Sequence, residues 1–279
     1  MRALSICVLI ASQARADSVA YGDAKAGALK APQGIACTAE GRVIVADTGN
    51  HRLLAYSFKD GALVPGAVFA FPELGSPSRV QIDSRGNVLA LDSKTRRIVR
   101  VGDDGRFGGF VTPKGVPAGK GYFPVSFKLG PRDELFILDA ASSRIIVLDR
   151  GGAFQRLIPE PLNARFDDLA VDAKGAVFAV DGRDAQVYAG SAVLASVKGL
   201  ADFASSIAVT AAGRLVLTDS HGHALLTLGA DGAFLGKRSA MGWSAGFLYY
   251  PEQLCLDAKG DLFVADRGNN RLQAFTAAP

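Results

Sequence analysis

The chain has 279 residues, a formal net charge of +4 and 49% hydrophobic residues, which is enough for one domain with a substantial core. So small a positive charge does not indicate a nucleic-acid-binding surface, where clustered Lys and Arg neutralise phosphates. The one apolar run near the N-terminus is shorter than the roughly 20 residues that span a bilayer. We therefore predict no nucleic-acid partner and no membrane span.

Residues 1–16 have the pattern of a secretory signal peptide. Arg2 supplies the positive charge, Ala3 to Ala11 form a short apolar segment, and Ala14-Arg15-Ala16 is an A-x-A cleavage site. Cleavage near Ala16 leaves residues 17–279 as a single mature domain with little net charge. We expect the protein to be periplasmic or secreted, with the periplasm preferred.

The first structural unit runs over residues 32–71. A β-branched run, Val43-Ile44-Val45-Ala46, is typical of a strand buried on both faces. The polar turn Asp47 to His51 follows it and leads into a further strand, Arg52 to Tyr56. With a short strand before and a looser one after, the unit is predicted to contain four antiparallel strands.

The same four-stranded unit recurs six times along the sequence. An aspartate ends the second strand of every copy, at intervals of 38 to 47 residues; the six are Asp47, Asp92, Asp139, Asp181, Asp219 and Asp266. A period near 44 residues with several short strands per unit is typical of a β-propeller. The sequence predicts an all-β, six-bladed propeller of four-stranded antiparallel blades, over 17–279, with almost no helix.

In four copies an arginine lies five residues after the aspartate, across the turn. Buried charges are normally paired, so we interpret these residues as structural turn staples and not as catalytic acids. The pairs are Asp47 and Arg52, Asp92 and Arg97, Asp139 and Arg144, and Asp266 and Arg271. Gln186 and Ala224 replace the arginine in the fourth and fifth copies.

The turns Asn50-His51-Arg52-Leu53 and Asn269-Asn270-Arg271-Leu272 resemble the NHL-repeat family, named for an Asn-His-Leu signature. The resemblance covers about residues 18–275 and implies an exported bacterial type of NHL propeller. It also implies a non-enzymatic scaffold that binds another protein or an envelope component, although the family gives no specific partner and no oligomeric state.

The last unit lacks a fourth strand, because the chain ends soon after Phe275. Ser18 to Tyr21 precede the first unit and belong to none. We predict that this N-terminal segment completes the last blade and closes the ring, which removes open strand edges.

Cys37 and Cys255 fall on the inner strands of the first and last blades. An exported protein is permitted a disulfide between them. Two buried free thiols are the simpler expectation, because a disulfide requires demanding geometry.

The inner strands begin on the same face as the polar turns, around the central channel. This mouth is partly acidic, and the hypothesis is a small ligand-binding site that includes a possible Ca²⁺ position, since hard cations take oxygen ligands. The ligand-binding candidates are Arg79, Asp167, Asp168, Glu252 and Gln253. The weak metal candidates are Asp167, Glu252, His221 and His223. No other cofactor is expected.

The alternative to a binding scaffold is a divalent-metal-dependent hydrolase or lyase, lactonase-like, that uses the acidic mouth. No known catalytic motif is matched, so no catalytic residue is assigned. The segment before the last blade is rich in aromatic residues, including Trp243, Phe247, Tyr249 and Tyr250. We expect these to pack in the core; any that are exposed would suit a protein partner.

Overall fold

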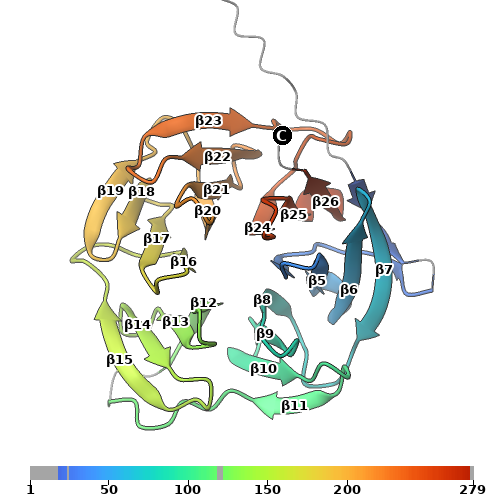
Figure 1. Cartoon of the computed structure of the whole chain (residues 1–279), viewed down its shortest axis with the longest axis horizontal. Helices are drawn as coiled ribbons and strands as arrows, with labels where there is room; N and C mark the ends of the chain where they lie inside the picture. Colours follow the sequence, from blue (N-terminus) through green and yellow to red (C-terminus); the bar gives the residue numbers. More distant parts are fainter. Residues whose placement is uncertain (1–17, 24, 118–121, 277–279) are drawn as a thin grey trace, which may run out of the picture.

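Six four-stranded antiparallel sheets are arranged radially around a central channel in the computed structural model (Figure 1). The structure describes residues 18–23, 25–117 and 122–276. The sequence prediction of a six-bladed β-propeller is confirmed. The predicted signal peptide, residues 1–16, lies outside the described residues.

Five blades are built from consecutive strands, numbered from the channel outward. Blade one contains β4 (Gly34–Cys37), β5 (Arg42–Asp47), β6 (Arg52–Lys59) and β7 (Ala62–Phe69). Blade two contains β8 (Pro77–Ile82), β9 (Val88–Asp92), β10 (Arg97–Val101) and β11 (Phe107–Phe110). Blade three contains β12 (Pro124–Leu129), β13 (Leu135–Asp139), β14 (Arg144–Leu148) and β15 (Phe154–Pro159). Blade four contains β16 (Asp168–Val171), β17 (Val177–Asp181), β18 (Gln186–Ala189) and β19 (Ala192–Ser196). Blade five contains β20 (Ala204–Val209), β21 (Leu215–Asp219), β22 (Ala224–Leu228) and β23 (Phe234–Arg238).

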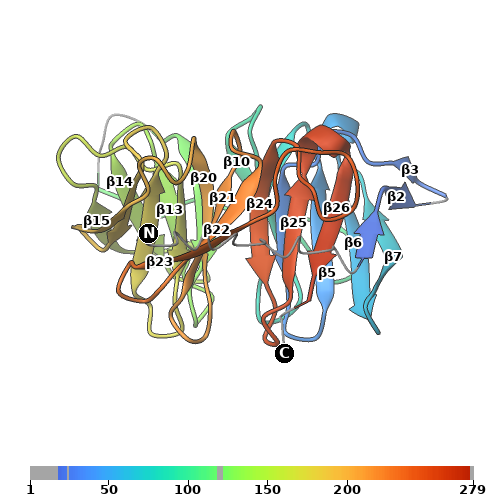
Figure 2. The ribbon, with the colours of Figure 1, turned by 90° about the horizontal axis from the view of Figure 1, so that it is seen from above.

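Blade six joins the two ends of the chain. Its inner strands are β24 (Pro251–Leu256), β25 (Leu262–Asp266) and β26 (Arg271–Phe275), and its outer strand is β1 (Ser18–Ala20). Strand β1 pairs antiparallel with β26, with Val19 opposite Gln273. The predicted closure of the ring by the N-terminal strand is confirmed. A small hairpin of β2 (Gly22–Asp23) and β3 (Gly27–Ala28) follows and projects beside blade one (Figure 2).

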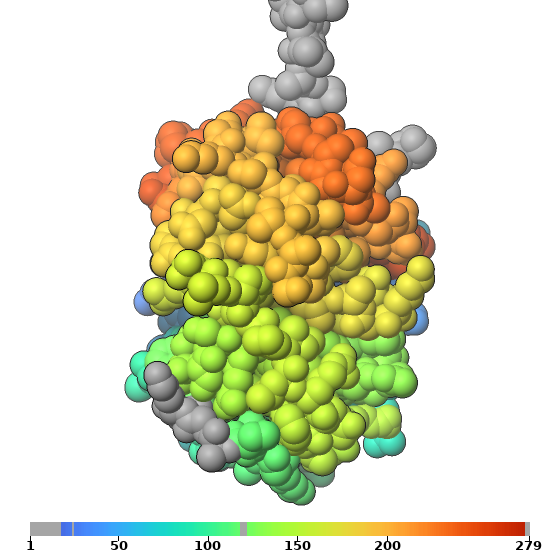
Figure 3. All heavy atoms as spheres, turned by 90° about the vertical axis from the view of Figure 1, so that its left-hand side faces the viewer, coloured from blue at the N-terminus to red at the C-terminus, as the bar shows by residue number. Residues whose placement is uncertain are grey.

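The second strand of each blade is buried because neighbouring blades cover both of its faces. Every residue of β9, β13, β21 and β25 is buried. The side chains of each strand alternate between two inter-blade clusters, so the core is a set of apolar layers between blades and not one central mass. Outer strands are more exposed and form the rim, part of which is visible in Figure 3.

The turn between the second and third strands has the same backbone feature in all six blades. The fourth residue after each aspartate adopts the left-handed conformation; these residues are His51, Arg96, Ser143, Ala185, His223 and Asn270. Glycine and asparagine suit this conformation best, but only Asn270 matches that preference. Helix in the described residues is limited to two 3-10 turns in these positions, η1 (Thr48–Asn50) and η2 (Arg267–Asn269).

In the part of the chain that the structure describes, no helix is long and apolar enough to cross a membrane.

Candidate functional site: the central channel and the turn face

The inner strands place two rings of side chains in the channel, because alternate residues of a strand point to the same side. The upper ring, nearer the aspartate turns, consists of Gly34, Arg79, Ser126, Asp168, Ser206 and Gln253. The lower ring, two residues further along each strand, consists of Ala36, Gln81, Lys128, Ala170, Ala208 and Cys255.

Asp168 of the upper ring is fully buried and accepts hydrogen bonds from both neighbouring blades. Its carboxylate accepts hydrogen bonds from Ser126 Oγ at 2.5 Å and Ser206 Oγ at 2.7 Å. The backbone N–H of Ile207 also donates to it at 3.2 Å. One carboxylate of blade four thus links blades three and five, and each of these bonds favours the ionised form.

Lys128 of the lower ring reaches up toward the same carboxylate. Its Nζ lies 3.7 Å from Asp168 Oδ2, an ion-pair distance longer than a hydrogen bond. Burial opposes ionisation of Asp168, but Lys128, Arg79 and the two serines together hold the pKa of Asp168 below its usual value. Burial lowers the pKa of Lys128, and Asp168 only partly offsets this effect. The pair is buried and electrostatically coupled.

Two further donors of the upper ring have no acceptor among the described residues. Gln253 is fully buried; its Oε1 accepts the Ile35 N–H at 3.0 Å, but its Nε2 is unpaired. Arg79 donates Nη1 to its neighbour's backbone, the Ser78 carbonyl, while its buried Nε is unpaired. Unpaired buried donors are uncommon in native proteins and call for an explanation.

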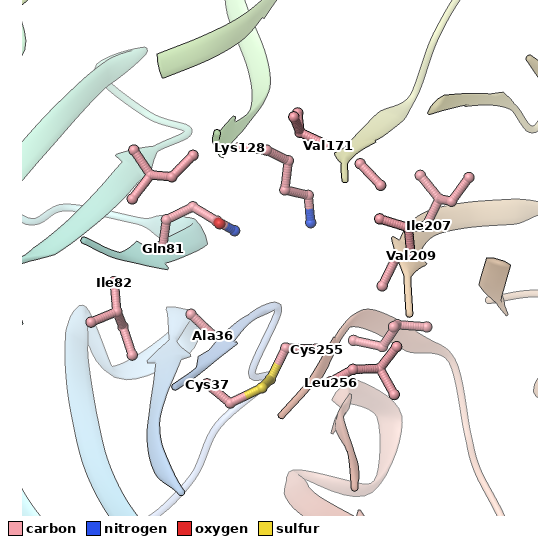
Figure 4. Close-up of a pocket in the computed structure, with 14 residues that line it drawn as sticks. Ala36, Cys37, Gln81, Ile82, Lys128, Val171, Ile207, Val209, Cys255 and Leu256 are labelled. Carbon is pink, nitrogen blue, oxygen red and sulfur yellow. A yellow bond between two sulfur atoms is a disulfide. The ribbon is translucent and has the colours of Figure 1, made fainter. Parts of the chain in front are cut away.

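At the level of the lower ring the channel holds a cavity of about 200 Å³ (Figure 4). Lys128 and Gln81 point into it from blades three and two. Its remaining wall is largely aliphatic, from Ile82, Val171, Val209 and Leu256 among others. The cavity therefore combines an ammonium group with an apolar wall.

A disulfide forms part of this wall. Cys37 and Cys255 are bonded across the seam between blades one and six, with their Cα atoms 6.0 Å apart. The expectation of two free thiols is wrong. The two cysteines lie one register apart on adjacent inner strands, and the opposed faces of the two blades bring their side chains together.

The predicted acidic mouth separates into two groups. Arg79, Asp168 and Gln253 do lie in the channel, as described above. Asp167 instead points back to its own blade and accepts the Gly182 N–H at 2.8 Å, while burial raises its pKa. Glu252 forms an ion pair with Arg267 at 2.9 Å. Neither carboxylate reaches into the channel with Asp168.

The sequence prediction did not include Ser126, Lys128 and Ser206. It considered the first positions of each inner strand and chose only their charged and amide side chains, so the two serines were passed over and Lys128, further along its strand, was not considered. The alternation of side chains along the inner strand does indicate that Lys128 faces the channel. A lysine in the third-blade segment Val125 to Leu129, two residues after a serine, shares the channel side with that serine.

The six turn aspartates are fully buried, and each binds the segment that leads into the inner strand of its own blade. A backbone N–H located 16 or 17 residues earlier donates to every carboxylate. The donors are Lys30 for Asp47, Ser76 for Asp92, Phe123 for Asp139, Arg165 for Asp181, Phe203 for Asp219 and Tyr249 for Asp266.

The predicted arginine pairing forms in three blades out of four. Nε of the arginine lies 2.7 Å from Asp47 Oδ2, 3.5 Å from Asp139 Oδ2 and 2.6 Å from Asp266 Oδ2 in blades one, three and six. The Asp92–Arg97 pair is wrong: no such ion pair is present within the described residues. The Arg97 guanidinium lies 3.2 Å from the centre of the Phe110 ring, because β11 brings that ring over it.

His221 and His223 belong to an aromatic cluster on the turn face of blades five and six. His221 packs against Phe203 with ring centroids 5.1 Å apart, and His223 stacks on Tyr249 at 5.3 Å. His223 Nδ1 accepts the Tyr250 N–H at 3.0 Å. Within the described residues, no group of three or more His, Cys, Asp or Glu side chains is placed to hold a metal ion.

The cluster ends in exposed side chains. Trp243 is 69% exposed, Met241 55% and Tyr250 40%. The expectation that these aromatic residues pack in the core is wrong for Trp243 and Tyr250. We call the connected rings of Phe203, His221, His223, Trp243, Tyr249 and Tyr250 the aromatic face.

The buried guanidinium of Arg271 holds the loop that carries the aromatic face. It is fully buried and donates to the carbonyls of Trp243 at 2.6 Å, Ser244 at 2.9 Å and Phe247 at 2.7 Å. The loop is therefore preorganised by the same residue that neutralises Asp266.

The repeated Asp-centred turn agrees with the comparison to known families. The NHL repeat family matches residues 29–56 and 248–275, which include the turns of blades one and six. The chain carries NHL repeats. Comparison with curated proteins finds no match.

Solved structures of the same fold are similar to this propeller over most of its length. A streptogramin B lyase shares 13% identity, with a TM-score of 0.67 over 88% of this chain and 93% of that one. A gluconolactonase of Xanthomonas campestris shares 15% identity, with a TM-score of 0.65 over 88% and 85%. An inactive virginiamycin B lyase of Staphylococcus aureus, solved with quinupristin, shares 14% identity, with a TM-score of 0.60 over 88% and 84%. These likenesses show the fold alone.

Proposed function

We propose that the protein is an exported, non-enzymatic NHL propeller that binds a protein or another envelope component through the aromatic face. The observation that carries this proposal is the exposure of Trp243 and Tyr250 beside a continuous series of rings in edge-on and tilted contact. Large contiguous apolar surface is rarely left in water without a role, and Trp and Tyr are the residues that most often anchor interfaces.

The rigidity of the loop supports the same function. Three carbonyls of the loop are fixed by Arg271, and Tyr250 is fixed by His223. A surface that is ordered before binding loses little conformational entropy when a partner docks. The disulfide between Cys37 and Cys255 supports export, because disulfides persist in oxidising compartments.

The lactonase-like alternative would use a metal ion held at the acidic mouth. Asp167 and Glu252, its predicted ligands, are each engaged elsewhere, by Gly182 N–H and by Arg267. We therefore prefer the binding function. A bound stoichiometric Ca²⁺ or Zn²⁺, detected by elemental analysis and by a loss of thermal stability with chelator, would favour the alternative.

Photo-crosslinking in the source cells tests the binding function. A photoreactive residue at position 243 should give a discrete crosslinked species. The matched control is position 162, where the leucine is 93% exposed but lies outside the aromatic face. Equal crosslinking at both positions, or none at position 243, would reject the aromatic face as the binding surface. The mass of the isolated protein tests export, because cleavage near Ala16 removes the first 16 residues.

A further inference from the structure

The central channel holds an excess of positive charge in its two rings of side chains. Arg79 and Lys128 each contribute one positive charge, and Asp168 contributes the one negative charge. Both Arg79 and Lys128 act electrostatically on Asp168. The carboxylate is already occupied by two hydroxyls and a backbone N–H. It therefore cannot fully satisfy both cations.

Three side chains of the channel have donor groups to offer. Lys128 Nζ lies 3.7 Å from its ion-pair partner, beyond hydrogen-bond range. Gln253 Nε2 and Arg79 Nε are buried and unpaired. These groups come from blades three, six and two. An acceptor with negative charge beside Lys128 would satisfy its ammonium, since charge-assisted hydrogen bonds are the strongest in this class, and the positive charge of Arg79 in the ring above would favour the same anion.

The cavity beside Lys128 limits the size and character of such an acceptor. Its volume is about 200 Å³, smaller than the 300–1,000 Å³ typical of sites for drug-sized ligands. Lys128 lines it, and Arg79 and Gln253 lie one ring above, about 7 Å along the strands. The lower wall presents Ile82, Val171, Val209 and Leu256 (Figure 4). The charged groups therefore lie toward the aspartate turns, and the apolar side chains lie toward the opposite end of the channel.

We propose that the channel binds a small organic monoanion, a short-chain monocarboxylate, with its carboxylate at Lys128 and its aliphatic tail along the apolar lower wall. The single net positive charge matches one negative charge, and an inorganic anion would leave the aliphatic wall without a partner. A cation would meet Lys128 and Arg79, and Asp168 has little acceptor capacity left for it.

Thermal unfolding with three six-carbon probes tests the proposal. Hexanoate, hexan-1-ol and hexylamine have the same tail but differ in the charge of the head. Hexanoate at about 100 times its Kd should raise Tm by roughly 5 °C, since a ligand that binds only the folded state stabilises it. The alcohol and the amine should produce no comparable shift. Equal shifts with all three would mean that the tail alone drives binding, and no shift with hexanoate would mean that water alone fills the channel; either result would overturn the proposal.

Two variants locate the site. Lys128→Gln removes the ammonium and should weaken hexanoate binding by about 10- to 100-fold, the loss expected for a charge-assisted hydrogen bond. Ala208→Leu leaves the charges intact but fills the cavity with a larger side chain, and should also abolish binding. The matched control is Lys174→Gln, on an exposed turn of blade four. Unchanged affinity in Ala208→Leu would overturn the proposal even if Lys128→Gln does not fold.

Nuclear magnetic resonance of the ligand detects hexanoate binding without relying on the thermal stability of the protein. Hexanoate labelled with ¹³C at the carboxyl should show a shifted or broadened carboxyl signal with the wild-type protein and a free signal with Ala208→Leu. The Trp243→Ala variant should bind hexanoate like the wild type, because the aromatic face is separate from the channel. Loss of crosslinking at position 243 and loss of hexanoate binding are thus distinguishable failures.

Discussion

Blades five and six solve the same structural problem in different ways. Both bury an aspartate that binds the segment leading into the inner strand. In blade six the carboxylate is paired with Arg271, which is itself fully buried and also holds three carbonyls of the preceding loop. In blade five the equivalent residue is Ala224, and Lys237 of the outer strand approaches Asp219 at 3.3 Å while 39% exposed.

The turns of the six blades share the buried aspartate but differ in the cation that neutralises it. The aspartate and its backbone donors are the fixed component in all six blades. The cation varies and determines what else the turn organises. In blade six it holds three carbonyls of the loop of the aromatic face, whereas in blade five Lys237 donates to one loop carbonyl, that of Leu200, at 3.2 Å.

Removal of the carboxylate charge should therefore affect the two blades unequally. Asp266→Asn leaves the buried Arg271 without its counter-charge, and should lower the free energy of unfolding by about 3–5 kcal/mol. Asp219→Asn weakens the hydrogen bonds from backbone N–H groups, but the lysine that loses its counter-charge is partly exposed to water. The free energy of unfolding should therefore fall by only about 1–3 kcal/mol. Urea unfolding measures both. Equal losses would show that Arg271 contributes no more than Lys237.

The disulfide at the seam of blade six is expected to have the next largest effect. Replacement of Cys37 and Cys255 by alanine should lower the free energy of unfolding by about 2–4 kcal/mol, because the bond closes a loop of 218 residues in the unfolded chain. A reductant should reproduce this loss in the wild type and have no effect on the double variant. A wild-type urea midpoint that does not respond to reductant would contradict the prediction.

The connection from blade three to blade four provides a pH-dependent test, because Glu160 directly follows β15. Burial raises the pKa of Glu160 to about 7, with Asp181 adding to the effect. The folded protein therefore retains a proton that the unfolded chain loses, and the stability from Glu160 is present below about pH 4.5 and lost as the pH rises through 7. Glu160→Gln should increase the free energy of unfolding at pH 8 by about 1 kcal/mol, a value reduced for partial exposure. The same variant should have no such advantage at pH 4.

The smallest expected effect concerns the left-handed residue of the turn. Blade six has asparagine there, with φ 52° at Asn270, whereas blade three has the exposed Ser143 with φ 47°. Ser143→Asn should raise the free energy of unfolding by about 0.5 kcal/mol, since asparagine tolerates this backbone conformation better. Thermal unfolding of the variant measures the gain. A lower Tm would indicate that the serine makes a contact that asparagine cannot keep.

The repeat was sufficient to predict the blades and the closure, because one buried aspartate per unit and an unpaired N-terminal strand leave few alternatives. The Asp92–Arg97 pair failed because spacing shows which side chains are within reach, but not that Phe110 competes for the guanidinium. Lys128 was missed although the alternation of its strand indicates the channel side. The disulfide depended on how the faces of two blades meet at the seam, a relation between residues 218 apart that local sequence does not encode.

The seam has a consequence for the order of events in folding. Cys37 and Cys255 are 218 residues apart, and the pairing of β1 with β26 spans a similarly long stretch of chain. Blades two to five can assemble from strands that are neighbours in the sequence, but the ring cannot be completed until β1 and β26 meet. Until then the inner strands of blades one and six have no common partner, and the channel has no complete wall. Completion of the circle is thus a late event that depends on the whole chain.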